Sequence, residues 1–220
     1  EISLAHKGVL FLDELPEFAS NTLQVLRQPI EDGYVRLARV DGIYKFPSQF
    51  QLIAAANPCP CGYFPDRNRC HCTPGQIRAY QRGISKPILE RMDLCVSLPS
   101  ITLQDALTKE KGISSAVLRK QVEKARKMQE RRFFQEEKIR WNGDMNVRAV
   151  NKYCELGKEE AEYMENIFKL KNLSMRTYHK ILKLARTIAD LEEEEKINMN
   201  HLAEAVSYRG LEEVLFSFEG

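Results

Sequence analysis

Two short apolar runs, each ending in polar side chains, constrain the fold of this chain more than any other feature. The first covers residues 8–13 and ends in the adjacent carboxylates Asp13 and Glu14; the second covers residues 51–56 and stops at Asn57. Continuous rather than alternating apolar runs are typical of parallel strands that are covered on both faces. The sequence therefore predicts an α/β fold with two buried strands, whose polar ends meet at the ligand-binding edge of the sheet.

The paired carboxylates are suited to a nucleotide site. Mg²⁺ prefers one or two carboxylates together with substrate phosphates, so Asp13 would hold a nucleotide-bound magnesium ion and Glu14 would polarise an attacking water. The amide of Asn57 would hold a water or a terminal phosphate oxygen. Plainer interpretations stay open, because acids also favour a following helix N-terminus and a lone asparagine also forms an Asx turn.

The remaining signals in the first hundred residues fit the same fold class. Residues 18–33 carry apolar side chains at helical spacing and end at Gly33, which predicts a helix. The turn dipeptide Asp41–Gly42 divides residues 34–46 into two runs, which predicts a β-hairpin. After the cysteine-rich loop we expect a short helix that leads into a third strand, which covers residues 94–98.

Beyond residue 101 the strand signals stop and helical signals replace them. Residues 117–139 form one long, highly charged helical stretch, and four more helical segments follow. Three of these begin at the cap-like residues Asn146, Ser174 and Asn198. The predicted organisation is a truncated parallel sheet with a hairpin insert over residues 1–100, a charged helical connector over residues 101–143, and an all-α domain over residues 144–220.

Four cysteines lie close together in a C-x-C…C-x-C arrangement: Cys59, Cys61, Cys70 and Cys72. Two short cysteine pairs joined by a loop suit a structural Zn²⁺ with four thiolate ligands, and a metal would order a loop with so little core of its own. His71 is an alternative ligand, and free thiols or disulfides are the other interpretations. Six cysteines are too few for a disulfide scaffold, so we expect a reducing, cytoplasmic location.

Bulk properties exclude some classes of protein. The net charge is +2, so any contact with nucleic acid would have to come from a local basic patch. No run of about eighteen apolar residues is present, so no membrane span is expected. The first residues lack the basic and apolar regions of a signal peptide.

Four segments of the chain resemble motifs of the magnesium-chelatase-like AAA+ ATPases, in order and at family-like spacing. GVLFLDELPEF resembles a Walker B motif, FQLIAAANPCPCGY a sensor 1 strand and loop, SKPILERMDL an arginine-finger segment, and LSMRTYHKILKLARTIADL a sensor 2 helix. Within this family the chain is similar to the competence-protein ComM group. Lys86 departs from the pattern, because a glycine is expected before the proline of the arginine-finger segment.

The resemblance implies a role for five residues: Asp13 as magnesium ligand, Glu14 as catalytic base, Asn57 as sensor 1, Arg91 as a finger inserted into a neighbouring subunit, and Arg176 as the sensor 2 arginine. Phosphoryl transfer spreads negative charge over the γ-phosphate oxygens, and a planar guanidinium stabilises that charge. The alternatives are an ion pair of Arg91 with Glu90 or Asp93, and a solvated Arg176.

A P-loop, G-x-x-x-x-G-K-[ST], does not occur in these 220 residues, because no two glycines are spaced as it requires. In the family this motif precedes the Walker B strand. We therefore expect the chain to be a fragment of a longer protein. Because the P-loop cradles the phosphates of the nucleotide, we expect this chain alone neither to bind ATP tightly nor to hydrolyse it.

The resemblance implies an ATP-driven, hexameric helicase that migrates DNA branches during recombination and natural transformation. In related motors the hairpin before sensor 1 grips DNA, which here makes Arg36, Arg39 and Lys45 candidate DNA contacts; a few such residues per subunit suffice in a ring. Ordinary exposed strand charges are the plainer interpretation. The alternative functions are a chelatase-like motor that remodels a protein partner for metal insertion, and a non-catalytic oligomerisation module.

Overall fold

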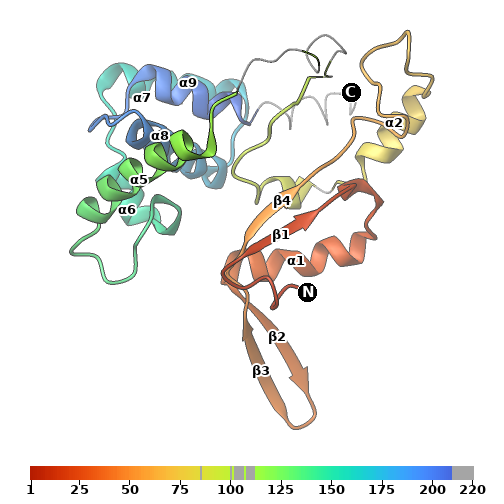
Figure 1. Cartoon of the computed structure of the whole chain (residues 1–220), viewed down its shortest axis with the longest axis horizontal. Helices are drawn as coiled ribbons and strands as arrows, with labels where there is room; N and C mark the ends of the chain where they lie inside the picture. Colours follow the sequence, from red (N-terminus) through yellow and green to blue (C-terminus); the bar gives the residue numbers. More distant parts are fainter. Residues whose placement is uncertain (85, 100, 102–106, 108–111, 210–220) are drawn as a thin grey trace. The chain divides into compact units, whose positions relative to one another are not determined.

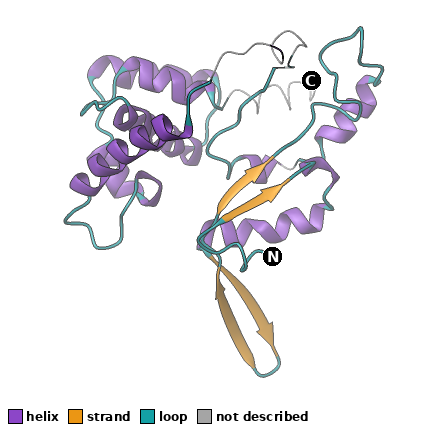
Figure 2. Cartoon of the chain, in the orientation of Figure 1, coloured by secondary structure: helices purple, strands orange, loops and turns teal. Residues whose placement is uncertain are grey.

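The computed structural model describes residues 1–84, 86–99, 101, 107 and 112–209. The chain divides into two compact units, the first comprising Glu1–Met92 and the second beginning at Asp93. Among the described residues every strand lies in the first unit, and the second unit is built from helices (Figure 2). These observations confirm the predicted fold class, a truncated α/β core followed by a helical domain.

A short parallel sheet forms where the two apolar runs predict it. β1 (Val9–Leu12) and β4 (Gln51–Ala54) pair in parallel in the first unit. The prediction that both faces are buried is wrong, because Val9, Phe11 and Ile53 are 54%, 58% and 42% exposed. Side chains alternate along a strand, so these three share one face. In the described chain that apolar face is open to solvent.

A helix and a hairpin connect the two parallel strands. α1 (Ser20–Asp32) ends as predicted at Gly33, whose φ of 70° suits the left-handed conformation at a helix C-terminus. β2 (Tyr34–Arg39) and β3 (Gly42–Pro47) form an antiparallel hairpin that projects away from the sheet (Figure 1). The turn lies one residue earlier than predicted, at Val40–Asp41, because strand pairing continues as far as the glycine.

The third predicted strand is absent from the structure. After α2 (Pro74–Gln81) and α3 (Lys86–Leu89), residues 94–98 have no regular secondary structure. A lone extended segment cannot pair its backbone groups in a ladder, and buried backbone groups need partners. Here the N–H of Cys95 donates to the carbonyl of Tyr208 at 2.9 Å, within the second unit.

The second unit contains five α-helices and one 3₁₀ turn among its described elements: α5 (Ser115–Arg132), η2 (Asn142–Asp144), α6 (Val147–Tyr153), α7 (Lys158–Leu170), α8 (Met175–Leu191) and α9 (Met199–Ser207). The side chains of Asn146, Ser174 and Asn198 accept N–H groups from the first turns of α6, α8 and α9, which confirms the predicted caps. α8 supplies much of the core and packs against α5, α6 and α9. None of the described helices is both long enough and apolar enough to cross a bilayer.

The charged helix α5 is shorter than predicted and is not solvated on all sides. It ends at Arg132 because Phe133 turns into the core and packs edge-on against Tyr153, with ring centroids 5.2 Å apart. Just beyond, Glu136 accepts hydrogen bonds from Tyr153 at 2.6 Å and from Lys152 at 3.0 Å. These two donors, Tyr153 first, hold the pKa of Glu136 below its ordinary value.

Candidate functional site

The two acids lie at the carboxyl end of β1, next to the end of β4. Hydrogen bonding between the two chains continues past the strands: Ala55 N–H donates to the carbonyl of Leu12 at 2.8 Å, and Leu15 N–H donates to the carbonyl of Ala55 at 2.9 Å. Asp13 and Glu14 lie between these bonds and are both exposed. The sheet therefore fixes the backbone around the acid pair while leaving both carboxylates open to a ligand.

Glu14 has an unusual backbone conformation. Its φ of 50° and ψ of 47° lie in the left-handed region, and its N–H donates to Asp13 Oδ1 at 2.9 Å. Residues other than glycine rarely adopt this conformation, which costs on the order of 1 kcal/mol and is found preferentially at functional sites. The turn separates β1 from the 3₁₀ helix η1 (Leu15–Glu17).

Asn57 and Tyr80 occupy the neighbouring position at the end of β4. The backbone of Asn57 lies close enough to the hydroxyl of Tyr80, near the end of α2, to act on it electrostatically. Burial, followed by the negative charges of Glu17 and Glu14, raises the pKa of this hydroxyl. Tyr80 is therefore close both to the predicted sensor residue and to the acid pair. Sequence reasoning missed it, because no local pattern links a helix residue to a strand end more than twenty positions earlier.

Arg91 is held by its own chain. Its Nη2 lies 2.6 Å from Oε1 of Glu31, near the end of α1, and its Nη1 donates to the carbonyl of Pro87 at 2.6 Å. The side chain is only 8% exposed. This ion pair thus involves neither of the sequence neighbours considered as partners, Glu90 and Asp93. For Arg91 to enter a neighbouring subunit, the bond to Glu31 would first have to break.

Arg176 lies in the first turn of α8, in the second unit, and is exposed. One turn later Lys180 binds Asp93, with Nζ to Oδ1 at 2.8 Å. Burial lowers the pKa of Lys180, and the nearby charges of Arg209 and Arg176 act in the same direction. The start of α8 is thus strongly basic, and the partial positive charge of the helix N-terminus adds to it. This end of the helix would attract an anion.

The hairpin carries the candidate DNA contacts on its exposed strands. Arg36 lies directly opposite Lys45 in the pairing of β2 with β3, and Arg39 pairs with Gly42 beside the turn. The ammonium of Lys45 lies 4.8 Å from the ring centroid of Tyr34. Like charges placed directly opposite each other destabilise a hairpin unless an anion lies between or beside them.

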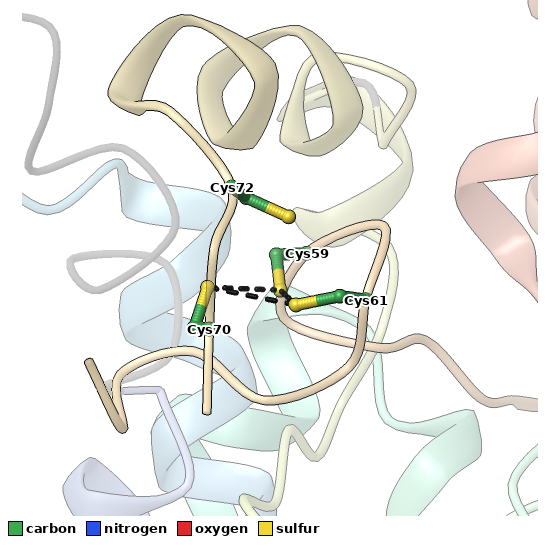
Figure 3. Close-up of side chains that lie close together, drawn as sticks. All are labelled: Cys59, Cys61, Cys70 and Cys72. Carbon is green, nitrogen blue, oxygen red and sulfur yellow. Dashed lines mark hydrogen bonds between the residues drawn. The ribbon is translucent and has the colours of Figure 1, made fainter. Parts of the chain in front are cut away.

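The four clustered cysteines converge as the spacing predicts (Figure 3). All four Sγ atoms lie within 4.8 Å of one another, with Cys59 to Cys61 at 3.3 Å, Cys61 to Cys70 at 3.6 Å and Cys59 to Cys70 at 3.8 Å. These distances far exceed the S–S bond of about 2.05 Å, so the thiols are free. His71 is exposed and is not a member of the group.

The cluster also favours the ligand form of one thiol. The backbone N–H of Tyr63 lowers the pKa of Cys61 to about 6, and the thiolate is the form that binds metals. Burial raises the pKa of Cys70, as expected for an apolar setting. The donor set of four sulfurs is that of a tetrahedral site for a soft metal ion such as Zn²⁺.

Comparison with known families agrees with this geometry. Residues 1–106 match the family described as magnesium chelatase, subunit ChlI, and residues 112–209 match the C-terminal family of the same subunit. The chain belongs to the magnesium-chelatase-related family. AAA+ ATPases are the wider group to which this family is related.

One of the curated relatives is named for competence. The chain is 43% identical to YifB of Salmonella typhimurium over its whole length, and 40% identical to the competence protein ComM of Haemophilus influenzae over 98% of its length. It spans 42% and 41% of those two proteins, respectively. The relatives are therefore more than twice as long as this chain.

Proposed function

We propose that this chain is part of an ATP-hydrolysing AAA+ motor. The observation that carries the proposal is the convergence of Asp13, Glu14 and Asn57 at the carboxyl ends of two paired parallel strands, where open α/β sheets bind their ligands. In this proposal Asp13 holds the magnesium of Mg-ATP, Glu14 activates the attacking water, and Asn57 contacts the water or the γ-phosphate. The phosphate-binding loop would come from elsewhere in the longer protein.

Two arginines complete the proposed site. Arg176 would approach the γ-phosphate from the basic start of α8, and Arg91 would serve the site of a neighbouring subunit. The second role requires a ring of subunits, most simply a hexamer. It also requires that subunit contact provides an anion able to replace Glu31 as the partner of Arg91. Coupling hydrolysis to assembly follows naturally, because the arginine reaches its phosphate only in the ring.

The proposed substrate is branched DNA, migrated during recombination and natural transformation. The hairpin supports this, because Arg36 opposite Lys45 on exposed strands forms a cationic pair suited to a phosphate backbone. The name of the Haemophilus relative supports the competence role. The chelatase-like alternative would instead use the motor to remodel a protein partner, without DNA.

We also assign a structural Zn²⁺ to the four clustered cysteines. Its ligands are the same side chains that the geometry brings together, and the ion itself would not contact the nucleotide.

Substitution of the proposed base tests the ATPase in the full-length protein. Glu14→Gln should retain ATP binding and lower the hydrolysis rate by about 10²–10⁴-fold, because a general base contributes that much. Glu17→Gln, which changes an exposed acid on the next turn, is the matched control and should hydrolyse ATP normally. Equal rates in the two variants would refute the assignment. Robust hydrolysis by the isolated 220-residue chain would also contradict it.

Binding to a four-way DNA junction separates the DNA motor from the chelatase-like alternative. Arg36→Gln combined with Lys45→Gln should weaken nucleotide-dependent binding and reduce the salt slope by about two, since each phosphate contact contributes roughly one. Lys158→Gln with Lys169→Gln, on exposed α7, is the charge-matched control. Absence of junction binding at moderate salt would favour the protein-remodelling motor.

A further inference from the structure

The sulfur cluster has the dimensions of a tetrahedral metal centre. With Zn–S bonds of about 2.3 Å, the ligands of a regular tetrahedron lie about 3.8 Å apart. The three S–S distances among Cys59, Cys61 and Cys70, at 3.3, 3.6 and 3.8 Å, are at or slightly below that edge. The backbone N–H of Phe64 donates to Cys59 Sγ at 3.4 Å.

The loop between β4 and α2 has only a small apolar core. Its buried cluster consists of Cys59, Cys70 and Ile77, with Phe64 and Cys72 packed against it. Most of these side chains are the thiols themselves. So small a cluster removes little apolar surface from water, which leaves the ordering of some fifteen loop residues, at about 1 kcal/mol each, largely unopposed. A metal cross-link supplies the missing stabilisation.

The same loop passes close to the predicted sensor residue, Asn57. Gly62 N–H donates to the carbonyl of Cys59 at 3.0 Å, which closes a turn containing two of the four sulfurs. Gly62 has a φ of 79°, and a Cβ built on it would lie 3.9 Å from both Cγ and Oδ1 of Asn57. The side chain of Asn57 therefore rests beside a turn whose shape depends on Cys59 and Cys61.

A second path runs through α2, which begins directly after the last cysteine. Its Ile77 is 1% exposed and packs on the sulfur cluster. One turn later, the hydroxyl of Tyr80 lies close to the backbone of Asn57, and Gln81 Nε2 donates to the carbonyl of Pro58 at 3.1 Å. Gln81 is 3% exposed, so this bond is shielded from competing water.

We infer that a metal ion held by Cys59, Cys61, Cys70 and Cys72 is a clasp that positions Asn57 beside the acid pair. The ion joins the two ends of the loop, fixes the turn under the Asn57 side chain, and sets α2 so that Tyr80 and Gln81 hold residues 57–58. Asn57 and Tyr80 are accordingly coupled to a metal that never contacts the nucleotide. The consequence for hydrolysis rests on the proposed ATPase; the metal and the clasp do not.

Metal analysis of the full-length protein is the first test. The purified protein should contain one zinc per chain. Cys61→Ser and Cys72→Ser, which alter the two less buried ligands, should each lower the zinc content at least severalfold, whereas Cys95→Ser and His71→Ala should not. A protein without zinc, or ligand variants that keep it, would overturn the metal site.

Hydrogen exchange tests the clasp itself, using wild-type protein with its zinc removed by a chelator under reducing conditions. Amide exchange should accelerate by about tenfold or more in peptides covering residues 55–62 and α2. The peptides of α8, in the other unit, serve as the internal control and should not change. Complete loss of zinc with unchanged exchange in residues 55–62 would refute the clasp, even if the metal site is real.

Tyr80→Phe separates positioning from metal binding. This variant should keep its zinc, accelerate exchange around residue 57, and lower kcat for ATP with little change in KM. Normal kcat together with normal exchange would show that α2 does not transmit the effect. If the wild-type protein hydrolyses no ATP, the motor proposal fails while the zinc and exchange results still decide the clasp.

Discussion

Replacing Asp190 with alanine should strongly destabilise the helical unit, because this carboxylate joins three separate elements of it. Asp190 is fully buried near the end of α8. Arg132, the last residue of α5, donates to both of its oxygens, and Arg186 donates from one turn earlier in α8 at 3.2 Å. Asn142 of η2 donates to Oδ2 at 2.8 Å.

The size of the destabilisation depends on which partners Arg132 and Arg186 keep once the carboxylate is removed. Removing one member of a buried ion pair costs about 3–5 kcal/mol, because the other charge stays buried without its counter-ion. Arg186 retains hydrogen bonds to the carbonyls of Glu194 and Glu195, and the Arg132 side chain is 14% exposed. Arg186 therefore keeps hydrogen-bond acceptors, and Arg132 keeps some contact with water. We expect a loss of about 3–4 kcal/mol, a large part of the stability of a typical domain.

Urea unfolding followed by tryptophan fluorescence measures this loss in the second unit alone. Trp141 is the one tryptophan of the chain, and it lies beside Asn142. With an m-value of about 1–2 kcal/mol/M, the midpoint should fall by roughly 1.5–4 M. Lys124→Ala is the matched control: it removes the exposed ion pair between α5 and Glu193 and should cost less than about 1 kcal/mol. Similar midpoints for the two variants would refute the reasoning.

Three further predictions concern other parts of the chain. In the assembled full-length protein, Arg91→Ala should lower ATPase activity by about 10³-fold, whereas Glu31→Ala, which releases the guanidinium, should retain most of that activity. If the two variants lost activity to the same extent and melting temperature to the same extent, the role of Arg91 would be structural. Gly83→Ala should lower the free energy of unfolding of the first unit by about 1–3 kcal/mol, because the new Cβ would lie 2.5 Å from the carbonyl oxygen of Pro16. Calorimetry measures this change, and an unchanged unfolding transition would contradict that clash. Since its tyrosine and lysine donors depress the pKa of Glu136, their stabilisation is present above the ordinary value of 4.5 and disappears as the pH falls through the lower, folded-state pKa. Urea midpoints of wild type and Glu136→Gln should therefore differ near neutral pH and converge in acid, and a constant difference would exclude this linkage.

Local signals predicted the helices of this protein well. Gly33 ends α1, and Asn146, Ser174 and Asn198 each cap a helix, because capping depends on a side chain and the backbone two or three residues away. The prediction of a strand at residues 94–98 was wrong for the opposite reason. A strand exists only with a partner, and an apolar sequence carries no information about whether that partner is present.

The candidate site shows the same difference between contacts that are local in the sequence and contacts that are not. The cysteine spacing predicted the cluster, since ligands close in sequence converge whenever a short loop closes. The partner of Arg91 was missed because Glu31 lies sixty positions away, while the acids considered were neighbours. Tyr80 was missed because its contact with Asn57 exists only once α2 has packed back on the loop. Contacts between residues far apart in the sequence form only when the chain folds, so local sequence patterns do not predict them.

The charges of this chain also differ in where they find their partners, which bears on function. The carboxylate of Asp190 collects donors from three elements of its own unit. Asp13 and Glu14, in contrast, are exposed, and within the described chain the Asp13 carboxylate hydrogen-bonds to the N–H of its neighbour. Structural charges are satisfied internally, whereas binding sites keep theirs for a ligand, and local conflicts concentrate at such sites. A left-handed Glu14 beside a second acid is such a conflict, and a divalent cation with bound phosphates would relieve its electrostatic part. This is why a cation and nucleotide, rather than a partner within the chain, are the proposed occupants of this sheet edge.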